Sequence, residues 1–409
     1  MKTQQKSLNV SMRNFFIFEF KKVFLSSKNL LIWAILVLIL IGYALMNMNL
    51  DRHTTSNKEG NFRTDQYHSD TDVNELLVMY EDLDTIPDKV QEQLDFWRLN
   101  SRYISEQLVY SRWLGRDRFK DVLMSSIKQD KNMIYGIDKG FVTGGLTDNL
   151  KLQKQYLKND ISFKQILYKK NIHPLNSDYV MTGYHFLYRA VSDLLPFIFT
   201  IMVLLFSADC ISNESESGSF KFLLIQPIFR AKVFLIKVFV SILHTFITVI
   251  STLLTVFLGT GLVNGFGEAA YPIAYDPITY HNFLSRVSEN GALHYTGIRN
   301  YLLLILPIFL SYLVFLSVFS TFISSLVSNS LSSMSIVAAS AILSYMFLRY
   351  LSHIAVFPAS IPFAYGNISR ILSGQNHITA LFSIVYLLTL SLILIVSGCF
   401  IFKRRDIVC

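Results

Sequence analysis

The residues best placed for chemistry lie in one polar stretch, Glu214 to Lys237, between two strongly apolar segments. Its acids and bases flank a short apolar run, a combination that suits ion pairing and contact with a protein partner. Catalytic signatures are missing. The sequence has no Gly-Lys dipeptide, and therefore no phosphate-binding P-loop, and no HExxH, CxxC or GxSxG motif. We therefore expect that this chain is not an enzyme and binds no cofactor itself.

The metal-binding residue types are too scattered to predict a metal site. The nine histidines stand singly, and the three cysteines lie far apart at 210, 399 and 409. His244 falls within an apolar segment, where a lone histidine is either functional or packed in a helix bundle. We favour packing. Asp193 and Asp209 lie near the two ends of another apolar segment, where we expect solvated side chains and no proton relay.

The composition is that of a membrane protein. Apolar residues make up 52% of the 409, and only 16% are charged, against about 25% in soluble domains. This excludes a disordered chain. A membrane-spanning helix needs about 20 apolar residues, and six segments qualify. They are residues 30–48, 190–209, 233–261, 301–323, 332–351 and 378–402. The predicted fold is an all-α integral membrane protein with six transmembrane helices.

The positive charge predicts the orientation of these spans. The formal net charge is +8, but the bases flank the apolar segments and do not cover one soluble region, so no nucleic-acid partner is expected. Twelve Lys or Arg residues lie in the N-terminus, in the loop after the second span and in the tail. The opposite short loops hold four, namely Arg286, Arg299, Arg349 and Arg370. Cytoplasmic loops are rich in Lys and Arg, so both termini are predicted to be cytoplasmic.

Three regions of the chain precede or follow the first predicted span. Residues 1–29 read as a cytoplasmic amphipathic helix at the membrane interface, or alternatively as an extension of the first span. Residues 49–187 read as an extracellular, mainly helical domain, because apolar residues recur at helical spacing after Pro87. Residues 188–409 hold the other five spans. Within them residues 352–377, apolar but interrupted by prolines, either dip into the membrane or form a surface loop.

The fifth span has small residues four positions apart. These pairs are Ser335 with Ala339 and Ser340 with Ser344. Small residues at this spacing let helices approach closely. We expect them to pack against another helix of the bundle or of a dimer; a position along a translocation path is the alternative.

The polar stretch carries a resemblance to a known family. It runs Glu214, Glu216, Gly218, then Phe222, Leu223 and Leu224, then Pro227, Arg230, Lys232 and Lys237. This order resembles the cytoplasmic loop of ABC-2-type transporter permeases, the membrane subunits of ABC exporters. The sequences EFKKVF at 19–24 and FKRRDI at 402–407 are similar to the two ends of that family. We also interpret the acids as preceding a helix that starts at Gly218 and Ser219.

The resemblance implies a function in the cytoplasmic membrane. Residues 210–232 would be the coupling loop that docks an ABC ATP-binding subunit, which would itself bind ATP and Mg²⁺. A second copy of the permease or a homologous permease would complete the transporter. It would export a peptide, lipid, drug or ion. The alternative is a non-transporting membrane sensor or resistance protein whose extracellular domain binds a peptide or a cell-wall ligand.

Overall fold

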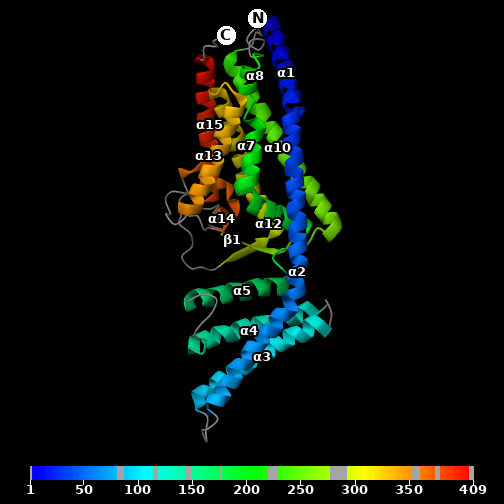
Figure 1. The fold of residues 1–409 in the computed structure, drawn as a ribbon, viewed down its shortest axis with the longest axis vertical. Helices are drawn as coiled ribbons and strands as arrows, with labels where there is room; N and C mark the ends of the chain where they lie inside the picture. Colours follow the sequence, from blue (N-terminus) through cyan, green and yellow to red (C-terminus); the bar gives the residue numbers. More distant parts are fainter. Residues whose placement is uncertain are drawn as a thin grey trace.

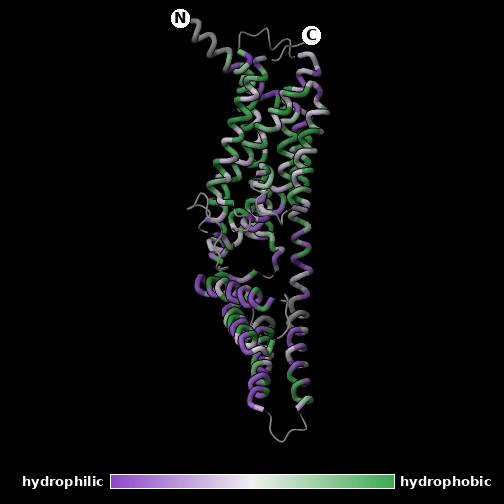
Figure 2. The backbone as a smooth tube through the Cα atoms, turned by 90° about the vertical axis from the view of Figure 1, so that its left-hand side faces the viewer, coloured by the Kyte–Doolittle hydropathy of each residue, from purple (hydrophilic) through white to green (hydrophobic). Residues whose placement is uncertain are grey.

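The computed structural model describes residues 2–80, 87–113, 118–142, 149–175, 177–219, 229–276, 293–351, 360–373 and 378–404. Its molecule is elongated. One end is a bundle of apolar helices, at whose tip α1 begins and α15 ends (Figure 1). The other end is a separate layer of helices α3, α4 and α5. Figure 2 shows the contrast in hydropathy between the mostly hydrophobic bundle and this more hydrophilic layer.

Six helical stretches of the described chain are long and apolar enough to cross a membrane. They are Ser27–Thr55, Gly183–Glu216, Arg230–Asn264, Ile298–Leu326, Ser330–Tyr350 and Ala380–Lys403. Each overlaps one of the six predicted spans, so the prediction of an all-α membrane protein is confirmed in its main features. A two-stranded hairpin is an addition that the sequence did not indicate. The strands β1 (Pro272–Tyr275) and β2 (His294–Gly297) are antiparallel, with Pro272 opposite Gly297.

The first span does not end where its apolar residues end. Helix α1 (Lys2–Phe24) stops at a short break, and α2 (Ser27–Met79) then runs for 53 residues, about 80 Å at 1.5 Å per residue. The predicted boundary at residue 49 therefore falls inside one helix. The residues beyond it are polar and contain no proline, and they pack against α3, so the helix continues.

The layer beyond the bundle is an inserted helical domain, built from the distal part of α2 with α3 (Asp88–Trp113), α4 (Phe119–Lys139) and α5 (Leu150–Lys170). These helices pack in chain order. Gly140 ends α4 with a left-handed φ of 74°, a conformation that suits glycine. The Asn149 side chain accepts hydrogen bonds from the first backbone N–H groups of α5 and so caps it.

The second span is a helix of changing pitch. It consists of α6 (Gly183–Arg189), a π-helical segment η2 (Ala190–Phe199), α7 (Thr200–Ser207) and, after a turn, α8 (Ser212–Glu216). Pro196 lies inside η2. Proline has no N–H to donate and disturbs the regular α-helical bonding. Thr200 Oγ1 lies 2.8 Å from the Leu195 carbonyl oxygen and 2.8 Å from the Tyr312 hydroxyl oxygen, which anchors this turn to a neighbouring helix.

The remaining helices surround α12. The central helix α12 spans Ile298–Leu326, and its neighbours are α10 (Arg230–Asn264), α13 (Ser330–Leu351) and α15 (Ala380–Arg404). Between α13 and α15 lie a 3₁₀ turn η4 (Pro362–Gly366) and α14 (Ile368–Leu372). Tyr365, Ile368 and Leu372 are fully buried in the main core cluster. The described part of the segment 352–377 therefore packs among the spans, as expected if it dips into the bundle.

Candidate functional site

A fully buried lysine lies where three helices meet at the tip of the bundle. Lys237 of α10 donates hydrogen bonds to Glu19 Oε2 of α1 and to Glu214 Oε1 of α8, each at 2.8 Å. All three side chains are at most 4% exposed. A buried charge is tolerated only with partners of opposite sign. The lysine therefore holds α1 and α8 against α10.

Two further lysines extend this arrangement. Lys22 of α1 forms an ion pair with Glu214. Lys28, at the start of α2, pairs with Asp209 and donates to the Leu205 carbonyl oxygen at 3.0 Å. The Asp209 side chain is only 16% exposed, so the expectation of a solvated aspartate there was wrong. Its carboxylate is paired with the Lys28 ammonium and not with water alone. We call Glu19, Lys22, Lys28, Asp209, Glu214 and Lys237 the lysine–carboxylate cluster.

Short polar contacts tie the α8 turn to two more helices. Ser324 Oγ of α12 accepts the backbone N–H groups of Ile211 and Ser212, each at 3.0 Å. Glu216 accepts the Ser330 N–H at 2.9 Å, at the first residue of α13. Glutamate near a helix N-terminus compensates its partial positive charge. Movement of α8 would therefore be transmitted to α12 and α13.

The predicted coupling residues fall into three groups. Glu214 and Lys237 are brought together in the cluster. Gly218 has a φ of 67° in the turn after α8, and the predicted helix after Gly218 and Ser219 falls on residues 220–228, which lie outside the described residues. The Glu216 carboxylate accepts a hydrogen bond at the start of α13, over 100 residues further along the chain. Phe222, Leu223, Leu224 and Pro227 lie outside the described residues.

The last two predicted residues are at the surface, where α10 begins. Arg230 and Lys232 are both exposed. The Lys232 ammonium lies 5.4 Å from the ring centroid of Phe229, which is itself 71% exposed. This cationic and aromatic surface lies directly after residues 220–228 of the loop.

His244 packs between aromatic rings. It meets Phe24 of α1 and Phe206 of α7 edge to face, with ring centroids 5.7 and 5.1 Å apart. Its surroundings are those expected of a packed bundle histidine. Among the described residues, no group of three or more His, Cys, Asp or Glu side chains is close enough to hold a metal ion.

Of the small residues predicted to pack on α13, Ser335 and Ala339 do not face this bundle. The inward face carries Ser333, Val337 and Ala341, which are at most 3% exposed. Ser335 and Ala339 are exposed, and Ser340 and Ser344 are half-buried. Small residues occur on both sides of the helix, so their spacing does not reveal which side packs. Among the described residues, Ser335 and Ala339 do not make the predicted close contact, because their side of α13 is exposed.

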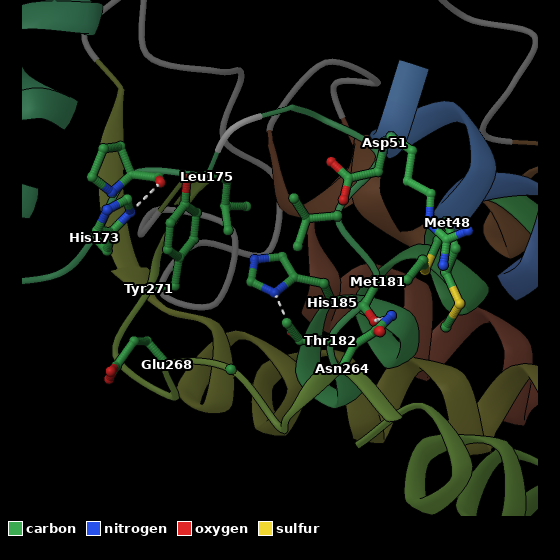
Figure 3. Close-up of a pocket in the computed structure, with 14 residues that line it drawn as sticks. Met48, Asp51, His173, Leu175, Met181, Thr182, His185, Asn264, Glu268 and Tyr271 are labelled. Carbon is green, nitrogen blue, oxygen red and sulfur yellow. Dashed lines mark hydrogen bonds between the residues drawn. The ribbon is translucent and has the colours of Figure 1, made fainter. Parts of the chain in front are cut away.

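A large cavity lies between the bundle and the inserted domain, with a volume of about 740 Å³. Its lining side chains come from α2, the segment before α6, and the end of α10 (Figure 3). His185 is buried, with Nδ1 2.7 Å from Thr182 Oγ1, and its Nε2 has no hydrogen-bond partner within the described structure. Outside the spans, burial raises the pKa of the Tyr271 hydroxyl, which lines the same cavity, to about 12.

The sequence of this chain matches a protein-family model. A model described as ABC-2 family transporter protein matches residues 14–407. The chain belongs to the ABC-2 transporter family. It is thus a component of a membrane transporter. Neither the curated proteins nor the solved structures gave a match to the chain.

Three residues of the lysine–carboxylate cluster in this ABC-2 chain were not among the candidates that the sequence indicated. Glu19, Lys22 and Lys28 all belong to the cluster but precede the loop by nearly 200 residues. One signal was present. Glu19 is the only acidic residue among the first 50, surrounded by bases and aromatic residues, and so it required a buried or interfacial partner.

Proposed function

We propose that this ABC-2 chain is the permease subunit of an ATP-driven exporter, with ATP and Mg²⁺ bound by ATPase subunits on separate chains. The observation that supports it most is the lysine–carboxylate cluster. It connects the short loop 210–232 to α1, α2 and α10, and the contacts of Ser324 and Glu216 add α12 and α13. A force applied to this loop would tilt several spans together.

The distribution of charge supports an intracellular position for this end. At the tip of the bundle lie the start of the basic helix α1, α8 and the end of α15, whereas the inserted domain lies at the opposite end (Figure 1). By the positive-inside rule the tip faces the cytoplasm and the inserted domain is extracellular. The protein would then span the cytoplasmic membrane, where an intracellular ATPase could reach the loop.

A second permease would complete the path. The outer side of α13 offers Ser335 and Ala339 between exposed apolar residues such as Ile336 and Leu343. Such a side permits close approach of another helix. We propose that a second copy or a homologous permease packs here, and that a peptide, lipid, drug or ion is exported between the two bundles.

The experiment separates docking from coupling. The tagged full-length chain is purified from native membranes, and its partners are identified by mass spectrometry. We expect a P-loop ATPase with the wild type. F229A/R230A, which alters the exposed surface after the loop, should lose the ATPase. Glu214→Gln, a buried change, should keep it but weaken the dependence of ATP hydrolysis on the permease. Phe400→Ala removes another exposed ring from α15 and is the matched control.

The outcomes discriminate between the hypotheses. An ATPase that binds F229A/R230A as well as the wild type would place the docking surface elsewhere. No ATPase under conditions that preserve complexes would contradict the exporter. The alternative of a non-transporting sensor has one observation in its favour, the 740 Å³ cavity beside the inserted domain. It requires binding of a peptide or cell-wall ligand that His185→Phe abolishes while no ATPase is recovered.

A further inference from the structure

A second cavity, of about 350 Å³, lies at the end of the bundle nearest the inserted domain. Three elements line it: η2, the last turns of α13, and the segment from η4 to α14. Its most polar lining residues are Arg349, Arg370 and Asn367. This cavity is separate from the lysine–carboxylate cluster and from the cavity of Figure 3, and neither of those sites uses its residues.

The charge of this cavity is uncompensated. Within the described structure neither Arg349 nor Arg370 forms an ion pair with a carboxylate. The adjoining stretches 352–359 and 374–377 contain no Asp or Glu in their sequence. Asp193, on η2 itself, is engaged by the Tyr43 hydroxyl. Among the described residues, the two guanidinium groups that line this cavity have no carboxylate partner, which favours an anionic ligand.

Three aromatic residues, Phe197, Tyr345 and Phe363, also line the cavity. Phe197 of η2 and Tyr345 of α13 have ring centroids 4.8 Å apart, and Phe363 packs edge to face on Phe319 at 5.6 Å. Aromatic surfaces of this kind accept methylene groups and exclude water. A fully hydrated inorganic anion gains nothing from such a lining, whereas an anion attached to a hydrocarbon chain does.

The position of the arginines matches the surface of a bilayer. Arg349 lies in the last turn of α13, one residue before the end of the candidate span Ser330–Tyr350. Arginine at the end of a span places its guanidinium at the level of the lipid headgroups. Below it α13 exposes Leu343 at 66% and Met346 at 50%, so an apolar strip runs from the cavity along the span.

We propose that this cavity binds the headgroup of an anionic phospholipid, with the phosphate between Arg349 and Arg370 and the acyl chains along α13. The Asn367 amide is a further donor. A lipid headgroup and a free phosphate would present the same phosphate group to the two arginines. The apolar residues exposed along α13 favour the lipid, because they can contact its acyl chains. The proposal depends only on the chain residing in a membrane and not on the direction of transport.

This proposal is tested by lipid titration of the purified full-length protein, followed by native mass spectrometry. The probes are anionic phosphatidylglycerol and zwitterionic phosphatidylcholine. We expect tighter binding of phosphatidylglycerol to the wild type. Each of Arg349→Gln and Arg370→Gln should weaken it about tenfold, the scale of one charge-assisted hydrogen bond, and leave phosphatidylcholine unaffected. Arg299→Gln removes a charge near the same end of the bundle but outside the cavity, and should change nothing.

Further measurements keep the proposal falsifiable. R349K/R370K retains the charge without the guanidinium fork; retained binding at intermediate affinity would show that the site folds. Equal affinity of the wild type for the two lipids would overturn the proposal, as would equal losses in Arg349→Gln and Arg299→Gln. Inorganic phosphate titrated against the wild type should not displace the lipid. If it binds as tightly as phosphatidylglycerol and depends on both arginines, the cavity is a free-anion site and the lipid is excluded.

Discussion

The two ends of the bundle differ in whether their charged side chains have partners of opposite sign. At the tip where α1 begins, Lys237 is fully buried and meets two carboxylates, and Lys22 and Lys28 each meet one. At the other end Arg349 and Arg370 line a cavity with no carboxylate partner in the described structure. Paired buried charges fix helices relative to one another, because separating them leaves a desolvated charge. Unpaired exposed charges beside aromatic rings are available to a ligand.

The difference separates two roles that the sequence alone does not distinguish. A lysine or arginine beside an apolar segment contributes to orientation in either case. The tip of the bundle uses its bases to connect α1, α8 and α10. At the opposite end, Arg349 and Arg370 have no carboxylate partner in the described structure and lie at the expected depth of lipid headgroups. Four variants test this contrast, and the lipid titration described above tests its ligand.

The largest effect is expected from Lys237→Met. It leaves Glu19 and Glu214 buried without their shared cation, and should cost about 3–5 kcal/mol of stability. Thermal unfolding in detergent, followed by circular dichroism, measures this. Lys232→Met, on the same helix but exposed, is the control and should change little. Equal stability of the Lys237 variant and the control would show that the cluster does not hold the helices together.

A paired charge in the inserted domain should give a smaller effect of the same kind. Lys164 pairs with Asp130 at 2.6 Å and with Asp160 at 2.7 Å, and its side chain is 18% exposed. Lys164→Met should destabilise α4 and α5 by about 2 kcal/mol, less than a fully buried pair because water reaches it. Hydrogen exchange of peptides from these helices in the full chain measures the change.

The same variant has a predicted pH dependence. Burial raises the pKa of the Asp130 carboxyl, and Lys164 opposes this. The folded state then holds a proton at a pH where the unfolded state has lost it, so stability falls as the pH rises from the unfolded to the folded pKa. Lys164→Met removes the opposing charge and should widen that interval. The protection lost at neutral pH should be partly restored in acid; equal loss at both would contradict this.

A still smaller effect is expected at the junction of α8 and α13. Glu216→Ala removes the acceptor of the Ser330 N–H and the negative charge near the start of α13. The side chain is exposed, so the loss should be about 0.5–1 kcal/mol. Asn213→Ala, also exposed on α8, is the control. Faster hydrogen exchange confined to the first turn of α13 would support the cap; unchanged exchange there would refute it.

The smallest effect on stability is expected from Arg349→Gln. Because this arginine has no carboxylate partner in the described structure, its removal should change stability by less than about 0.5 kcal/mol, measured by the same thermal unfolding. A loss comparable to that of Lys237→Met would mean that both ends use their charges structurally, and the contrast would disappear.

The sequence by itself determined the class and the family of this protein. The six apolar segments are long enough to span a bilayer, and lipid forces such segments into helices because it offers their backbone no hydrogen-bond partners. The order of residues from Glu214 to Lys237 was sufficient to suggest the ABC-2 transporter family, which the family model confirms. These are local properties, readable from composition and short-range order.

Only the tertiary structure decided which residues meet. Glu19 and Lys237 are 218 residues apart, and nothing in the spacing of either predicts the other. The inward side of α13 carries Val337 and Ala341, whereas Ser335 and Ala339, with similar spacing, face away. The partner of a charge and the packed side of a helix depend on how distant segments come together, because both are set by desolvation and contact in the folded bundle.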